Sequence, residues 1–337
     1  MASVEGKATP TVGRADPRAP FIVLMPLYED WDALPLLLAH LDVALAGHGM
    51  TCDVVVADDG SRSTPPAPTI LPASFPAAGV RSVTIVRLGR NLGHQRAIAI
   101  GLAYIHAAHP GTTVVVMDSD GEDAPEDVPR LMEASREAGS CLVFAARSQR
   151  SEGWLFRMLY RVFRVVHRVL TGTSISFGNF SVVPGPLLPR LVILSELWSH
   201  YPAAAIKARL PLVTLPVRRA RRLRGRSRMN LIALILHGLG AIAVHGDVVG
   251  VRALVAMLVA TVLIMMGIGA VVTVKFATDL AIPGWATYAV GLLVAILLQT
   301  LLLALVFVFV TLNNRSYSTF IPRRDYRDYV VGETRFP

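Results

Sequence analysis

The chain has 337 residues, of which 53% are hydrophobic, and it carries a formal net charge of +9. Soluble basic proteins are rarely this apolar, so the composition argues against a purely soluble protein and points to membrane segments. Cys52 and Cys141 lie beside predicted strands and fit buried thiols of a reducing compartment rather than a disulfide framework.

Residues 1–19 are polar and contain prolines, so we expect a disordered N-terminal tail with no signal peptide. Runs rich in Val, Ile and Leu predict strands, at residues 21–25, 53–57, 83–87, 114–117 and 142–145. Helices are predicted up to about residue 47, after residue 93 and near 125–138, and the proline-rich residues 62–79 predict a loop. This alternation predicts a mostly parallel α/β sheet, which binds ligands beyond the carboxyl ends of its strands. No dinucleotide-binding or P-loop glycine motif follows a strand.

An acidic cluster follows the predicted strand at residues 114–117, and it contains Asp118, Asp120, Glu122 and Asp123. These carboxylates repel one another unless a cation neutralises them, and Mg²⁺ or Mn²⁺ prefers oxygen ligands. Alternate residues of an extended chain point the same way, so Asp118 and Asp120 are predicted to face one ion. The alternative is an acidic loop that caps the next helix, and the spacing alone leaves both open.

Residues 147–170 combine two stripes at helical spacing. The basic stripe contains Arg157, Arg161, Arg164 and Arg168, and an apolar stripe runs beside it from residue 156 to 170. This pattern predicts an amphipathic helix in the membrane interface, with a core-packed helix whose arginines are solvated as the alternative. Residues 230–250 predict a second interfacial helix.

Two uncharged stretches, between Arg252 and Lys275 and at residues 286–312, exceed the ~20 residues that cross a bilayer as a helix. They predict a two-helix transmembrane hairpin at residues 251–312. The flanks of the hairpin are rich in arginine and its connecting loop is nearly neutral, so the positive-inside rule places both termini in the cytosol. Residues 20–229 then form a cytosolic domain and residues 313–337 a cytosolic C-terminal tail. Anionic lipids, rather than nucleic acid, are the expected partners of these arginines.

Four motifs in order carry a family resemblance. P-L-Y-E-D at residues 26–30 resembles the P-x-Y-N-E opening of family 2 glycosyltransferases, and A-D-D-G-S at 57–61 resembles their V-D-D-G-S. R-N-L-G at 90–93 is similar to their R-N-x-G helix start. M-D-S-D-G-E-D-A-P-E at 117–126 resembles M-D-A-D-L-Q-D-P-P-E of the polyprenyl-phosphate branch, which contains dolichol-phosphate mannose synthases and GtrB-like glucosyltransferases. The resemblance implies a GT-A (Rossmann-like) domain ahead of the membrane helices.

The resemblance also implies roles for individual residues. The implied ligands of a nucleotide-diphosphate sugar are Pro26, Tyr28, Glu29, Asp58, Asp59, Arg222 and Arg228. The implied metal ligands, for Mg²⁺ or Mn²⁺, are Asp118, Asp120 and Glu122, of which Glu122 stands where the family usually has Gln. The implied ligands of the acceptor phosphate are Arg147, Arg157 and Arg161, and the implied catalytic set is Asp118, Asp120 and Arg147. Arg228 replaces the family's Lys, and Asn179 stands where many relatives have Asp and provides no general base.

The histidines, among them His94, His106 and His237, show no metal-ligand spacing and are expected to be structural or surface residues. The expected reaction is metal-dependent transfer of a single hexose, from a donor of the UDP-glucose or GDP-mannose type, to undecaprenyl phosphate with inversion. It would occur at the cytosolic face of a bacterial inner membrane, and the resemblance allows a homo-oligomer such as a tetramer. The alternatives are a processive polysaccharide synthase, whose Q-x-x-R-W motif and additional spans are missing from this sequence, and a catalytically inactive membrane scaffold.

Overall fold

The computed structural model describes residues 20–63, 78–139, 141–147, 154–175, 177–218, 220–224, 231–278, 282, 284–316 and 320–336. The chain divides into two compact units. The first contains Met1–Trp154, Ile175–His237 and Phe320–Pro337, and the second contains Leu155–Ser174 and Gly238–Thr319.

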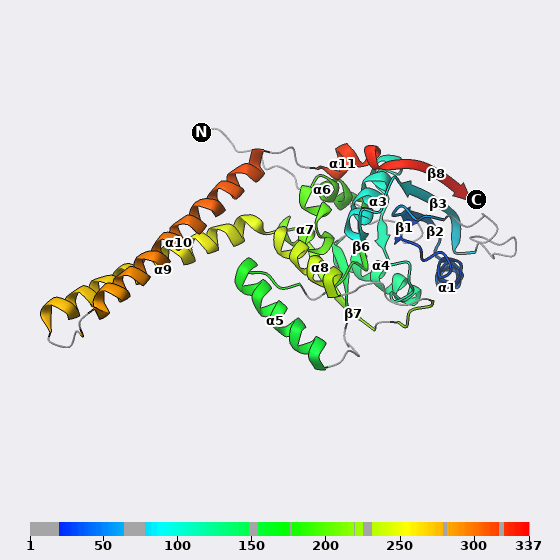
Figure 1. Ribbon diagram of the computed structural model, residues 1–337. Helices are drawn as coiled ribbons and strands as arrows, with labels where there is room; N and C mark the ends of the chain where they lie inside the picture. Colours follow the sequence, from blue (N-terminus) through cyan, green and yellow to red (C-terminus); the bar gives the residue numbers. More distant parts are fainter. Residues whose placement is uncertain are drawn as a thin grey trace, which may run out of the picture. The chain divides into compact units, whose positions relative to one another are not determined.

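The first unit is built on one mixed sheet (Figure 1). Its strands are β1 (Phe21–Leu27), β2 (Cys52–Asp58), β3 (Val80–Leu88), β4 (Val114–Val116), β5 (Leu142–Arg147), β6 (Ser181–Val183), β7 (Leu212–Val217) and β8 (Val330–Phe336). Their spatial order is β7-β5-β6-β4-β1-β2-β3-β8. β6 and β8 pair antiparallel with their neighbours, and the other strands run parallel to one another. The predicted mostly parallel α/β sheet is therefore confirmed.

Helices bury both faces of this sheet. They are α1 (Leu34–Ala46), α3 (His94–Ala108), α4 (Val128–Glu137), α6 (Leu188–Val192), α7 (Tyr201–Lys207) and α11 (Pro322–Asp325). α3, α6 and α7 share one core with alternate residues of β1 and β2, and α1 and α4 share the other. A sheet buried on both faces needs strands that are apolar on both sides, which explains the continuous Val, Ile and Leu runs of β1, β2 and β4.

The C-terminal residues return to this sheet, which corrects the expected tail at residues 313–337. β8 pairs antiparallel with β3 in a register that sets Val83 opposite Phe336, and Figure 1 shows the two strands side by side. The aromatic ring of Phe320 lies 3.8 Å from that of Trp198, between ring centroids. An edge strand is held largely by backbone hydrogen bonds and is half exposed, so its sequence carries little hydrophobic periodicity.

The second unit contains the apolar helices. α9 (Gly246–Ala277) and α10 (Trp285–Ser316) pack against each other and are long and apolar enough to cross a membrane. α5 (Trp154–Thr171) is shorter than the helix predicted over residues 147–170, because β5 continues to Arg147. The helix predicted at residues 230–250 is also shorter, because α8 (Leu231–Ala243) ends at Ala243. α9 begins at Gly246, before the predicted start of the transmembrane hairpin at residue 251. Val162, Val165 and Val169 of α5 are exposed, and Arg252 donates a hydrogen bond to the Val169 carbonyl.

Candidate active site

Three loops meet at the carboxyl edge of the sheet because β4, β1 and β2 are parallel neighbours. The register sets Leu27 opposite Asp58, at the ends of β1 and β2. The backbone N–H of Asp59 donates to the Leu27 carbonyl at 2.8 Å, and that of Met117 donates to the Leu24 carbonyl at 3.0 Å. The strand-end motifs predicted from the sequence therefore lie beside one another.

The loop after β4 holds its carboxylates in a tight turn. The N–H of Glu122 donates to Asp120 Oδ1 at 2.9 Å, and the N–H of Asp118 donates to Asp123 Oδ2 at 3.0 Å. Gly121 has a φ of 82°, which lets the chain reverse between these residues. Burial, followed by the charge of Asp118, raises the pKa of Asp120 to about 6. The loop therefore concentrates negative charge that a cation would stabilise.

Arg222 supplies positive charge to this loop. Its guanidinium donates to Asp120 Oδ2 at 3.0 Å and to Asp30 Oδ2 at 2.6 Å. Backbone hydrogen bonds hold the residues around Arg222 beside the acidic loop. The N–H of Ala220 donates to the Glu122 carbonyl, and the N–H of Leu223 donates to the Asp120 carbonyl. Arg222, an implied ligand of the nucleotide-diphosphate sugar, thus lies against the acidic loop, while Arg228 is outside the described residues.

The predicted nucleotide side is formed by the loops after β1, β2 and β3. Both carboxylate oxygens of Asp59 accept backbone hydrogen bonds, from Leu92 at 2.7 Å and Gly93 at 2.8 Å. Gly60 has a φ of 69°, and a Cβ there would lie 2.4 Å from the carbonyl carbon of Arg90. Asp59 therefore joins two motif loops that only a glycine at position 60 allows to touch.

Asp58 and Glu29 complete this side. Asp58 is buried and accepts a hydrogen bond from the Ser61 N–H, and its Oδ2 has no hydrogen-bond partner among the described residues. Glu29 adopts a left-handed backbone with a φ of 57°, and its Oε1 accepts the Arg62 N–H at 2.7 Å. Pro26 is buried within β1, and Tyr28 is partly buried.

The structure places His94 at the acidic loop, although the sequence suggested no functional role for it. Its Nε2 lies 3.1 Å from Asp118 Oδ1 and 2.8 Å from Asn179 Nδ2. Desolvation alone would lower the pKa of His94, but the charge of Asp118 and their hydrogen bond raise it. Gln95 donates to Asn179 Oδ1 at 3.0 Å, and its own Oε1 accepts the Tyr201 N–H at 2.7 Å. The position of His94 in the sequence could have indicated this role. His94 follows directly after R-N-L-G and begins α3 at the carboxyl edge of the sheet.

The predicted acceptor arginines are not brought together by the described structure. Arg147 ends β5 and Arg157 lies on α5, but the side chains of both are outside the described part of the chain. Arg161 is exposed on α5, in the second unit. Their joint role at an acceptor phosphate stays a prediction.

The carboxylates of the acidic loop fit a divalent cation that substrate oxygens help to bind. Within the described ranges, no group of three His, Cys, Asp or Glu side chains has the arrangement of a metal cage. Mg²⁺ is commonly held by one or two carboxylates together with substrate phosphates, which Asp118 and Asp120 can provide. Burial, followed by the charge of Asp118, raises the pKa of Asp120, and a bound cation would offset both causes.

The chain's first half matches a known family. The model of the family described as Glycosyl transferase family 2 matches residues 22–184. Those residues form a glycosyl transferase family 2 domain. The domain has the expected GT-A fold, and it includes β1 to β6 together with the acidic loop, His94 and Asn179. Arg222 and β8 lie outside it.

Curated relatives resemble a longer part of the chain. A protein of Edwardsiella ictaluri named undecaprenyl-phosphate 4-deoxy-4-formamido-L-arabinose transferase is 29% identical over 215 residues, 63% of this chain and 64% of that protein. A protein of the same name from Klebsiella pneumoniae (strain 342) is 27% identical over 218 residues, 63% of each chain. The match therefore spans slightly less than two thirds of the length of these relatives.

Solved structures resemble the domain more distantly. Glucosyl-3-phosphoglycerate synthase from Mycobacterium tuberculosis, in complex with Mn²⁺, UDP-glucose and phosphoglyceric acid, superposes with a TM-score of 0.47 at 20% identity. The superposition covers 68% of this chain and 79% of that one.

Proposed function

We propose that the protein is a membrane-anchored glycosyltransferase that moves one sugar from a nucleotide-diphosphate sugar to a polyprenyl phosphate. The family 2 domain and the relatives named as undecaprenyl-phosphate sugar transferases support this proposal. The two long apolar helices support anchoring beside a lipid acceptor. The relatives' names specify an arabinose derivative, so a donor screen should include it beside the predicted hexoses.

The observation that carries the proposal is the Arg222 bridge between Asp30 and Asp120 at the carboxyl edge of the sheet. A guanidinium aimed at an acidic loop is suited to bind a diphosphate, because its fork of donors matches phosphate oxygens. A divalent cation held by Asp118 and Asp120 would offset the charge that develops on the leaving diphosphate. Asp58 is buried beside this edge, with its Oδ2 3.9 Å from the Nε of Arg87, so it would act on the nucleotide side through the loop that it holds.

In the proposed reaction, a phosphate oxygen of the acceptor attacks the anomeric carbon as the bond to the diphosphate breaks, with inversion. The nucleoside diphosphate leaves with the electron pair of that bond. An ionised acceptor phosphate needs no proton removed, so the absence of a carboxylate at Asn179 is compatible with direct displacement. His94 contacts Asp118 and Asn179 contacts His94, so the pair would orient Asp118 in this scheme. Arg147, Arg157 and Arg161 remain the proposed acceptor ligands.

We place the catalytic domain on the cytosolic side of a bacterial inner membrane, because arginines flank both apolar helices. Anionic lipids, rather than nucleic acid, are the proposed partners of these flanks. A homo-oligomer, such as a tetramer, is compatible with this arrangement.

The deciding experiment is a transfer assay with purified full-length protein, undecaprenyl phosphate, Mn²⁺ or Mg²⁺, and labelled UDP-glucose, GDP-mannose and UDP-4-deoxy-4-formamido-L-arabinose. One lipid-linked sugar per acceptor supports the proposal. Polymer would indicate a processive synthase, and no transfer from any donor, with the protein folded, would indicate an inactive scaffold. Asp120→Asn should abolish transfer, whereas Glu133→Gln, at an exposed position of α4, serves as the matched control.

A further inference from the structure

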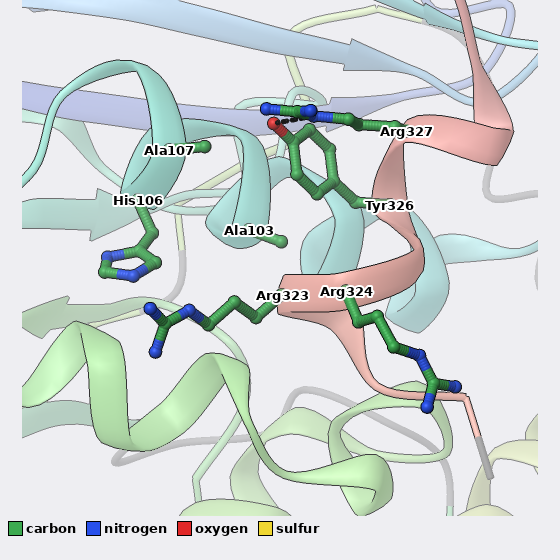
Figure 2. Close-up of a pocket in the computed structure, with 7 residues that line it drawn as sticks. All are labelled: Ala103, His106, Ala107, Arg323, Arg324, Tyr326 and Arg327. Atoms are coloured by element: carbon green, nitrogen blue, oxygen red, sulfur yellow. Dashed lines mark hydrogen bonds between the residues drawn. The ribbon is translucent and has the colours of Figure 1, made fainter.

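A basic pocket lies between α3 and the C-terminal residues that return to the sheet (Figure 2). The cavity has a volume of about 380 Å³. Arg323, Arg324, Arg327 and His106 line it, together with Tyr326 and two alanines of α3. No carboxylate is among these lining residues, so the wall is positively charged.

Two of the three guanidiniums already have partners. Arg324 donates to both carboxylate oxygens of Asp325, at 2.5 and 2.9 Å. The Nε of Arg327 donates to the Tyr326 hydroxyl at 3.2 Å, as the dashed line in Figure 2 shows. Arg323 is exposed, and within the described ranges no carboxylate pairs with it. Its guanidinium points toward His106 in Figure 2.

The pocket therefore has a net positive charge, because the carboxylate of Asp325 offsets only that of Arg324. Figure 2 shows the guanidinium of Arg323 pointing toward His106, and burial, followed by the charge of Arg323, lowers the pKa of this imidazole. An anion between the two side chains would offset the charge of Arg323 and favour protonation of His106. Arginine binds phosphate oxygens with two parallel hydrogen bonds, and the cavity has room for a phosphate group with its substituents.

We propose that this pocket binds the phosphate of an anionic phospholipid head group. The lipid assignment rests on the surrounding chain. Arg323 follows Ser316, the last residue of the apolar helix α10, by only seven positions. The aromatic rings of Trp198, Phe320 and Tyr329 cluster beside the same segment. Aromatic and arginine side chains next to a membrane helix favour the head-group region of the bilayer.

The pocket is distinct from the candidate active site. His106 and His94 lie twelve residues apart on α3, which corresponds to about 18 Å along a helix. His94 contacts the acidic loop at one end of the helix, and His106 lines the pocket near the other. The proposal therefore does not depend on sugar transfer.

The test measures lipid binding to the full-length protein in a neutral detergent, by native mass spectrometry with dioctanoyl phosphatidylglycerol. Arg323→Gln removes the unpaired guanidinium, and Ala107→Glu places a carboxylate at an exposed position of the pocket wall. Each should weaken binding by about fivefold or more. Arg136→Gln, an equal charge change at an exposed position of α4, should leave binding unchanged.

Thermal unfolding of each variant verifies folding, and glycerol 3-phosphate is titrated as a soluble probe. Equal lipid affinity in the wild type and both pocket variants would overturn the proposal and leave the arginines with a topological role only. The proposal would also fail if glycerol 3-phosphate bound as tightly as the lipid with the same loss in the variants, because the site would then serve a soluble anion.

Discussion

Replacing Arg222 with glutamine removes the cation that bridges Asp30 and Asp120. Without a nucleotide, the guanidinium occupies Asp120 Oδ2, an oxygen that a divalent cation would use. If the proposed metal site is correct, Arg222 and the metal compete for the same carboxylate in the free protein. In the proposed complex with nucleotide, the guanidinium would contact the diphosphate instead. The substitution should consequently strengthen metal binding to the free protein and weaken nucleotide binding.

The magnitude follows from the hydrogen bond that the metal has to displace. A hydrogen bond between charged groups contributes about 1.5–3 kcal/mol when buried. The side chains of Arg222 and Asp120 are 17% and 18% exposed, so solvent screening favours the lower end of that range. About 1.5 kcal/mol corresponds to roughly a tenfold change in affinity. We expect Arg222→Gln to bind Mn²⁺ about tenfold more tightly without nucleotide, and the nucleoside diphosphate about tenfold more weakly.

The assay is a Mn²⁺ titration by electron paramagnetic resonance, without nucleotide and then with the diphosphate of the active donor. Arg221→Gln is the matched control, because Arg221 is an exposed neighbour in the same loop. Asp120→Asn should remove Mn²⁺ binding from both backgrounds. An unchanged or lower Mn²⁺ affinity in Arg222→Gln would refute the competition, and an unchanged diphosphate affinity would refute the donor role of Arg222.

Three further predictions test other parts of the structure. Gly121→Ala should destabilise the protein by about 1–2 kcal/mol and raise the KM for the donor. The reason is that residue 121 has a positive φ and that its Cβ would lie 2.4 Å from Leu223. An unchanged melting temperature would contradict this. Because burial and Asp118 raise the pKa of Asp120 to about 6, protons should compete with the metal near and below that pH, and Mn²⁺ affinity should fall about fivefold from pH 6 to pH 5. A flat pH dependence would show that Asp120 does not bind the metal. Deleting residues 330–337 should lower the melting temperature by exposing the edge of β3, whereas deleting residues 1–19 should not; equal effects would mean that β8 contributes nothing to the sheet.

The ionisation of Asp120 makes the stability of the folded protein depend on pH. Its pKa in the folded protein is higher than the ordinary value of 3.8, so ionisation costs the folded state more than the unfolded chain. This group therefore lowers the stability of the metal-free protein as pH rises from about 4 to about 6. A bound cation reverses the effect, so added Mn²⁺ should raise the melting temperature more at pH 7 than at pH 5.

The strands β1 to β5 and the apolar helices were predictable because their signals are local. A strand is indicated by a short run of Val, Ile and Leu, and a membrane helix by an uncharged stretch long enough to cross the bilayer. Both are properties of neighbouring residues. The boundaries were less predictable: residue 147, the predicted start of the amphipathic helix, belongs to β5, and α5 begins at Trp154. β6, β7 and β8 were missed because their sequences are short, exposed or lacking in clear alternation.

The sequence by itself determined which chemical groups this protein presents: acidic residues after three strands, glycines at the turns, and arginines beside two apolar stretches. Only the tertiary structure decided which of these groups meet. Arg222 reaches Asp120 across 102 residues and Asp30 across 192, and His94 meets Asn179 across 85. No local pattern encodes such contacts, because they arise from the order of the strands in the sheet and from the loops that cross its carboxyl edge.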